Sequence, residues 1–291
     1  MGAYRGFVVW GSGIILVLGA FLIFVAAGWP GAENCCIYDP TTKNPCQDRK
    51  LDKNNACYCE AFKAAEAKSG APGVRQPVNT WFNLYSILTS LLVAIFIYLD
   101  RANGNTLNPI RSDGWLPDLY IFAVLFLGLG SMWFHGSLKA WGGTADILSM
   151  FVFAAFLVFY TIRRLWDADW FFWIFYPITV LAFTIVGSLW QWEYNSLVLI
   201  LILVAAYLTF EVIIWVRTGA VMQGKPLTIV LWIGAVACII AATIFWILSQ
   251  TGGPLCDPNS AFQPHGLLWH PLAGAMAVLL YFYWREDEQS A

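Results

Sequence analysis

The chain has 291 residues, of which 59% are hydrophobic and only 12% are charged, and its formal net charge is −2. Soluble domains are about half apolar and about a quarter charged, so this composition excludes an ordinary soluble protein and indicates a polytopic membrane protein. The small net charge identifies no class of partner, and no nucleic-acid partner is expected.

Eight apolar runs are long enough to cross a hydrocarbon core, which takes about 20 residues of helix. Because lipid leaves helices as the only spanning form for such runs, we expect an all-α membrane helix bundle. It consists of a seven-helix core and one additional N-terminal transmembrane helix. The expected spans are residues 7–28, 78–99, 116–136, 145–162, 170–190, 196–216, 227–249 and 266–284.

Residues 1–30 hold the additional helix, in which Arg5 precedes the apolar stretch. A cleaved signal peptide is the alternative, but the apolar run exceeds a signal core of about 7–15 residues. We therefore expect a retained helix. The helix is followed by a cysteine-rich extracytoplasmic cap at 31–76, the seven-helix core at 77–285 and a cytoplasmic tail at 286–291.

Basic residues indicate the orientation, because short cytoplasmic loops collect Lys and Arg. The short loops on one side of the eight-helix arrangement carry only Lys139, whereas the opposite side collects eight basic residues. These are Arg5, Arg101, Arg111, Arg163, Arg164, Arg217, Lys225 and Arg285. We therefore expect both termini in the cytoplasm. Tryptophans near the predicted helix ends, Trp269 among them, are typical of interface anchors.

Six of the seven cysteines lie on the predicted outer side, and they are Cys35, Cys36, Cys46, Cys57, Cys59 and Cys256. Cysteines gathered on one face indicate up to three disulfides in an oxidising compartment, with the pairing open. A zinc site is the alternative, but this cluster lacks the two-residue spacing of a zinc knuckle. Cys238 stands alone within a predicted helix.

The three histidines of the chain, His135, His265 and His270, all fall at the outer membrane edge of the predicted helices, and Asp146 opens the following helix at that level. Ionisable groups at membrane depth are costly and usually face inward for function. Three imidazoles beside a carboxylate are typical of a catalytic zinc site, where three protein ligands leave a fourth position for water.

Ser131 lies four residues before His135 and hence on the same helix face. Its hydroxyl could hydrogen-bond a substrate carbonyl or the oxyanion that develops from it. Asp146 could accept a proton from an attacking water or orient a ligand. The structural alternatives are an N-cap or helix-dipole role for Asp146 and a small residue at a helix contact for Ser131.

These residues carry a resemblance to the alkaline ceramidases, seven-helix membrane hydrolases of a superfamily that also holds progestin-type receptors. The family pattern is a Ser, three residues, a His, an Asp eleven residues later, and two His before the last helix. This chain has "SMWFH" from Ser131 to His135, Asp146 at the family's spacing, and "HGLLWHPLAG" before its last helix. The segment "NTWFN" at 79–83 matches the start of the family's first helix.

The resemblance implies a zinc amidohydrolase that cleaves the N-acyl bond of ceramide to a sphingoid base and a fatty acid. In that scheme His135, His265 and His270 bind zinc, Asp146 takes the proton of the activated water, and Ser131 supports the oxyanion. The partners would be a lipid substrate and the bilayer. The alternatives are a lipid receptor or transporter-like bundle without turnover, and a related hydrolase that acts on a lipid ester.

The terminal histidine pair departs from the family pattern, because four residues separate His265 from His270 where the family has three. On a regular α-helix five residues turn by about 500°, which leaves the two rings about 140° apart. A one-turn π-bulge would restore their convergence, and Pro271 favours an irregular turn because it lacks a backbone donor. The alternative is that His265 reaches in from the loop before the helix.

A second departure concerns calcium. Family members with a calcium site place acids before and within the first core helix, whereas this chain has Gln76 at that place. This argues against a calcium site, with Glu33 and Asp39 in the first loop as the alternative acids.

Glu211 lies within the sixth predicted helix, where a carboxylate that faced lipid would be costly. A structural hydrogen bond across the bundle and a role in substrate binding are the two interpretations.

Overall fold

The computed structural model describes residues 2–31, 59–60, 72–104, 108–189, 195–218, 226–250, 253–257 and 260–286. Its regular elements are α1 (Gly2–Ala27), α2 (Pro77–Phe82), α3 (Tyr85–Ala102), α4 (Trp115–Ser137), α5 (Ala140–Trp166), α6 (Asp169–Leu189), α7 (Asn195–Thr218), α8 (Pro226–Leu248), the π-helix η3 (His265–Trp269) and α9 (His270–Arg285). Within this part, seven helical segments are long and apolar enough to cross a membrane. The prediction of an all-α polytopic bundle is thereby confirmed.

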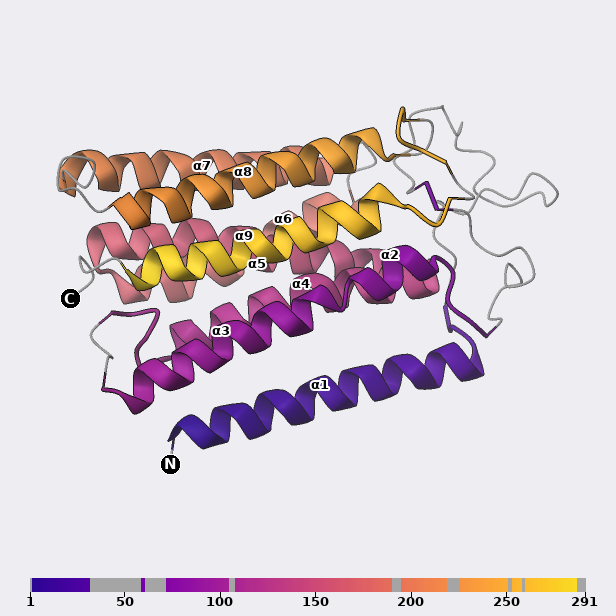
Figure 1. The fold of residues 1–291 in the computed structure, drawn as a ribbon, viewed down its shortest axis with the longest axis horizontal. Coiled ribbons are helices and arrows are strands. Elements are labelled where there is room, and N and C mark those ends of the chain that lie inside the picture. The colour runs from indigo at the N-terminus through magenta and orange to yellow at the C-terminus, as the bar shows by residue number, and fades with distance from the viewer. Residues whose placement is uncertain are drawn as a thin grey trace.

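The long helices lie side by side, with the start of α1 and the end of α9 at one end of the bundle and α2 at the other (Figure 1). Helix α5 packs against α4, α6 and α7, and α9 packs against α3 and α8. In α4 and α5, 78% of the most apolar stretch is buried, compared with 11% in α8. Helices α4 and α5 therefore form the inner part of the bundle, and α8 forms its surface.

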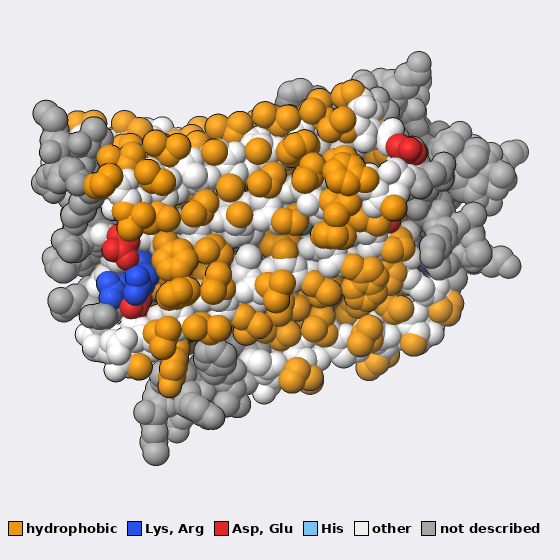
Figure 2. Space-filling model, viewed as in Figure 1, with side chains coloured by type: hydrophobic (Ala, Val, Ile, Leu, Met, Phe, Trp, Pro, Cys, Tyr) orange, Lys and Arg blue, Asp and Glu red, His pale blue; other side chains and the backbone are white. Residues whose placement is uncertain are grey.

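The outer surface is apolar along the middle of the bundle. On the face in Figure 2, hydrophobic side chains cover the middle, and charged side chains lie near the two ends. Large apolar residues point outward from α6, α7 and α8, as in Leu181, Leu201 and Ile240, which are 60%, 48% and 55% exposed. An apolar surface of this kind suits contact with lipid tails, and the chain is an integral multi-pass membrane protein.

Helix α1 confirms the prediction of a helix before the core, and it is apolar over Gly11–Ala27, where its side chains are described. Its last turns pack on α4 through Phe21, whose ring lies edge-to-face against Trp133 with a centroid distance of 5.9 Å. Trp29, just after α1, contacts the same Phe21 ring at 5.3 Å. A Cβ at Gly136 would come within 2.7 Å of the Phe21 ring, so glycine permits this close approach. Helix α1 is therefore attached to the outer side of the turn that carries His135.

A two-residue link joins α4 to α5. Leu138 adopts a left-handed conformation with φ of 50°, and its N–H donates to the Phe134 carbonyl at 2.6 Å, which ends α4. Helix α5 then begins at Ala140, five residues earlier than the predicted span. The short link keeps the end of α4 and the start of α5 adjacent, so His135 and Asp146 lie at the same end of the bundle.

Glu211 in α7 is completely buried near the other end of the bundle. Its Oε1 accepts from Arg164 at 2.6 Å and from Thr161 at 2.9 Å. Trp284 also donates to Oε1 at 3.4 Å, and the Tyr283 hydroxyl donates to Oε2 at 2.7 Å. These donors come from α5 and α9, so the structure supports the structural interpretation of Glu211 as a connection across the bundle.

Asp100, at the end of α3, forms a second buried polar cluster with α9 and the loop before α4. Arg285 donates to both of its carboxylate oxygens at 2.8 Å. Arg111 adds contacts at 3.2 Å, and Tyr281 donates at 3.4 Å. This cluster fastens the last helix to the first core helix.

One of the expected disulfides is present, between Cys59 in the first loop and Cys256 in the segment between α8 and η3. Cys238 has a free thiol, in agreement with its isolated position. The other cysteines expected to pair, Cys35, Cys36, Cys46 and Cys57, and the loop acids Glu33 and Asp39 lie outside the described residues.

Candidate metal centre

The three histidines converge at the end of the bundle that also carries α2. His135 lies near the C-terminal end of α4, His265 begins η3, and His270 begins α9. One ring nitrogen of each lies within 4.8 Å of the other two, and all three residues are at most 3% exposed. The predicted cluster therefore forms, and it could hold a metal ion.

The spacing of the nitrogens suits a small ion with a tetrahedral ligand set. His135 Nε2 and His265 Nε2 lie 3.2 Å apart. Bonds of about 2.0–2.1 Å from zinc to nitrogen imply a separation of about 3.4 Å between two tetrahedral ligand atoms. The His270 ring centroid is 4.8 Å from that of His265 and 5.9 Å from that of His135. The third ring is thus close enough to join the set after a small adjustment.

His270 provides a further observation in favour of an ion. Its Nε2 is buried and has no hydrogen-bond partner among the described residues. A buried polar atom without a partner costs about 1–3 kcal/mol, and a metal ion would remove that cost. The Tyr85 ring stacks on His270 with a centroid distance of 5.9 Å and an interplanar angle of 20°, which holds the imidazole from the side of α3.

The η3 turn explains how histidines five residues apart can converge. The chain is π-helical over His265–Trp269 and continues directly into α9 at His270. A π-helix pairs residues i and i+5, so the ring that a regular helix would turn away returns to the same side. Of the two expected explanations for the spacing, the π-turn is the one found, and His265 lies within it rather than in the preceding loop.

Gln76 determines which nitrogen of His135 faces the cluster. The Gln76 Oε1 lies 2.6 Å from His135 Nδ1, while the Gln76 Nε2 donates to the Glu60 carbonyl at 2.8 Å. Because an amide oxygen only accepts, His135 Nδ1 must carry the proton, which leaves the Nε2 lone pair directed at the other histidines. Metal-binding histidines usually donate their second N–H to an acceptor in this way.

Asp146 and Ser131 line a cavity of about 20 Å³ together with His265 and His270. Ser131 and Asp146 come from α4 and α5, and their side chains lie close together in the wall of this cavity. A cavity needs about 10–15 Å³ to hold one water, so this space suits a water molecule. The structure thus brings together the five predicted site residues. Asp146 is the seventh residue of α5, which shows that the N-cap alternative is wrong.

An apolar pocket of about 400 Å³ adjoins this cavity. Asp146, Met150, Trp246 and Trp269 line both spaces, so the polar groups lie at one end of the pocket. The remaining walls come mainly from α5, α7 and α8 and include Ile147, Ile200, Val204, Ile239, Ile240 and Thr243. Since Ile240 is also 55% exposed on the outer surface, the pocket opens sideways between membrane helices.

Three residues at the centre were not predicted to belong to it. The sequence indicates Gln76 only as the residue in the place of a calcium ligand, and Trp269 only as an interface anchor. Nothing in the local sequence of Tyr85 indicates that its ring meets α9. One local feature does point to a role for Gln76: it is a polar residue directly before Pro77, where an apolar helix begins.

A scan of the chain against models of known protein families finds no match, and neither does a search of curated proteins. These comparisons therefore leave the resemblance to the alkaline ceramidases as an expectation from the sequence pattern of Ser131, His135, Asp146, His265 and His270.

Proposed function

We propose that the chain is a zinc-dependent hydrolase that cleaves the N-acyl bond of ceramide, or of a close relative, within the membrane. One observation carries this proposal. Three buried imidazoles converge, two of them line a water-sized cavity together with Asp146 and Ser131, and that cavity adjoins an apolar pocket.

The ligand set favours zinc. His135, His265 and His270 would hold the ion through neutral imidazole nitrogens, which suit zinc, whereas magnesium and calcium prefer oxygen ligands. Zinc in such a site supplies a Lewis acid for the amide carbonyl and makes a water in the fourth position more acidic.

Asp146 supplies the acid–base chemistry in this scheme. Its carboxylate accepts a proton from the water as the water oxygen attacks the amide carbon, and returns a proton to the nitrogen as the carbon–nitrogen bond breaks. The water oxygen ends in the fatty acid, and the nitrogen leaves as the amine of the sphingoid base. Ser131, whose hydroxyl lies beside Asp146, would donate a hydrogen bond to the carbonyl oxygen as that oxygen gains charge.

The apolar pocket supports a lipid substrate. Its volume of about 400 Å³ lies within the range of about 300–1,000 Å³ found for ligand sites. Aliphatic tails would enter sideways from the bilayer between α7 and α8, and the amide would stop at the polar end. Met150, Trp246 and Trp269 lie at the junction of pocket and cavity, where they limit the access of bulk water.

We further propose that the metal centre faces the extracytoplasmic side, periplasmic or lumenal, with both termini in the cytoplasm. The Cys59–Cys256 disulfide supports this, because disulfides persist in oxidising compartments. Arg111 and Arg164 lie toward the opposite end of the bundle, in agreement with the excess of basic residues on cytoplasmic sides.

The test is the zinc content of detergent-purified protein beside the release of fatty acid from a labelled ceramide, on the same samples. We expect about one zinc per chain in the wild type, and loss of both zinc and hydrolysis in His135→Ala and His270→Ala, because three ligands are needed. A thermal unfolding curve for each variant separates loss of the ion from loss of the fold.

Each other outcome has a distinct meaning. Zinc present in the wild type with no release from ceramide would contradict the amidase and direct attention to a lipid ester or to a receptor. A wild type that binds no metal would contradict the metal centre itself.

A further inference from the structure

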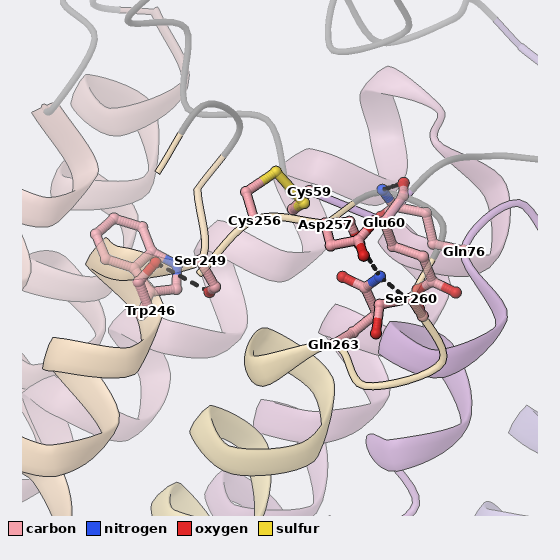
Figure 3. The surroundings of a disulfide bond; sticks show 9 residues. All are labelled: Cys59, Glu60, Gln76, Trp246, Ser249, Cys256, Asp257, Ser260 and Gln263. Atoms are coloured by element: carbon pink, nitrogen blue, oxygen red, sulfur yellow. Dashed lines mark hydrogen bonds between the residues drawn. A yellow bond between two sulfur atoms is a disulfide. The ribbon is translucent and has the colours of Figure 1, made fainter. Parts of the chain in front are cut away.

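A chain of contacts connects His135 to the Cys59–Cys256 disulfide. Figure 3 shows the Cys59–Cys256 bond with Glu60, Gln76 and Gln263 on one side of it and Trp246 and Ser249 on the other. None of these residues belongs to the proposed ligand set or to the reacting groups. Their contacts nevertheless connect the disulfide to two of the three histidines.

Gln76 holds His135 at two points. Its side-chain Oε1 lies 2.6 Å from His135 Nδ1, and its backbone N–H donates to the His135 carbonyl at 3.1 Å. Both residues are at most 4% exposed, so water does not compete for these contacts. The position of residue 76 therefore determines where the His135 ring can lie.

Glu60 fixes Gln76 in turn. The Gln76 Nε2 donates to the Glu60 carbonyl at 2.8 Å, which sets the direction of the amide and presents its oxygen to His135. The Glu60 carboxylate accepts from the backbone N–H groups of Val78 and Asn79, each at 2.8 Å. Glu60 thus holds both the side chain of Gln76 and the start of the helix that follows it.

The disulfide fixes the position of Glu60. Cys59 precedes Glu60 directly and is bonded to Cys256, which is 197 residues away in the sequence. Directly after Cys256, the Asp257 carbonyl accepts from Gln263 Nε2 at 3.0 Å, and the Gln263 carbonyl accepts from the Leu267 N–H at 2.9 Å inside η3. The bond therefore ties the support of His135 to the turn that carries His265.

We propose that Gln76 is the positioning residue of the metal centre, and that the Cys59–Cys256 disulfide maintains its position through Glu60. This inference rests on the proposed function, because it requires an ion at the three histidines. It implies that reduction of a disulfide outside the ligand set weakens metal binding. The centre would then hold its ion fully only in an oxidising compartment.

The first test compares zinc affinities, measured by competition with a chelator, for detergent-purified wild type, Gln76→Leu, Gln76→Glu and Gln250→Leu. We expect Gln76→Leu to bind zinc about 10–100-fold more weakly, as for other residues that orient a metal ligand. Gln76→Glu keeps an acceptor for His135 Nδ1 but loses the donor to the Glu60 carbonyl, so we expect a smaller loss of affinity than in Gln76→Leu.

Gln250→Leu is the matched control. Gln250 lies at the same end of the bundle, and its Nε2 donates to the Trp246 carbonyl at 2.9 Å rather than to a histidine. We expect its zinc affinity to equal that of the wild type. A general loss of packing would lower the affinity of both leucine variants and would not be rescued by glutamate.

The second test removes the disulfide with the double variant Cys59→Ala/Cys256→Ala, with and without Gln76→Leu. If the bond acts through Gln76, the double cysteine variant by itself binds zinc more weakly than the wild type. Adding Gln76→Leu to that variant then lowers the zinc affinity by less than Gln76→Leu does in the wild type. Co²⁺ in place of zinc gives a second readout, since a turned His135 ring changes the visible spectrum of the bound ion.

The outcomes separate the two proposals. Equal zinc affinity in the wild type and a folded Gln76→Leu variant would overturn this inference and leave the proposed function intact. Weakening in Gln76→Leu with no change on removal of the disulfide would overturn the part assigned to the bond. Absence of zinc from the wild type would overturn the proposed function, and this inference with it.

Discussion

The two ends of the bundle both bury polar side chains, but only one end satisfies them from within the protein. At Glu211, both carboxylate oxygens receive donors from neighbouring helices, among them Arg164 and Tyr283. At the other end, three imidazoles meet one another, and His270 Nε2 has no partner among the described residues. A buried cluster whose donors and acceptors pair with one another stabilises the fold, whereas one with an unpaired nitrogen could hold a ligand.

The two ends also differ in whether their buried ionisable side chains form ion pairs. Glu211 and Arg164 are opposite charges 2.6 Å apart with side chains that are 0% and 3% exposed, so each compensates the other. The histidine cluster instead brings together three groups of the same kind. Its ring nitrogens lie within 4.8 Å of one another and could hold a metal ion, which is the ligand that we propose for it.

The largest expected effect on stability is at the satisfied end. Replacing Glu211 with Ala removes the carboxylate that Arg164 contacts at 2.6 Å, and we expect a loss of about 3–5 kcal/mol in the free energy of unfolding, because this ion pair is buried. Unfolding in detergent measures it. The double variant Glu211→Leu/Arg164→Met, which removes both charges, should recover most of the loss. A Glu211→Ala protein that unfolds like the wild type but has lost zinc would reverse the comparison.

At the incomplete end, a change that keeps the ion should affect chemistry alone. Asp146→Asn retains the shape of the side chain and removes the base, and we expect hydrolysis to fall by about 10²–10⁴-fold. Zinc content and thermal stability should match the wild type, because Asp146 is not among the three imidazole ligands. Hydrolysis at the wild-type rate would show that another group transfers the proton.

The smallest effect is expected where a satisfied cluster has donors to spare. Arg111→Met removes one of the partners of Asp100, which keeps both contacts to Arg285 and the Tyr281 hydroxyl. Since the Arg111 side chain is 21% exposed, we expect a loss of at most about 1 kcal/mol in stability. Thermal unfolding measures the loss, and zinc binding should not change. A loss as large as that of Glu211→Ala would mean that the Asp100 cluster depends on every donor.

The helices and the histidine cluster could be predicted because their signals are local. Apolar runs of sufficient length define spans without any knowledge of their neighbours, and the predicted and observed limits of the last helix, 266–284 and His265–Arg285, nearly coincide. The cluster followed from the helix directions, since alternating spans place His135, Asp146 and the terminal pair at one edge.

The contacts across helices could not be predicted, because no local pattern records which side chain meets which. Glu211 was recognised as costly in lipid, but its partners on α5 and α9 are separated from it by up to 73 residues. Gln76 lies 59 residues from His135, and its role depends on an amide direction that Glu60 sets. The sequence left two explanations for the spacing of His265 and His270, and only the backbone conformation could choose between them.

The π-helical turn also determines where the last helix tolerates a change of length. Deleting Leu268 would leave three residues between the two histidines, and a regular α-helix places residues at that spacing on one face. A deletion further along α9 would instead rotate every later residue by about 100° and carry Tyr281 and Tyr283 away from Asp100 and Glu211. The contacts of Asp100 and Glu211 thus fix the register of α9, and the π-turn that accommodates the additional residue lies beside the candidate metal centre.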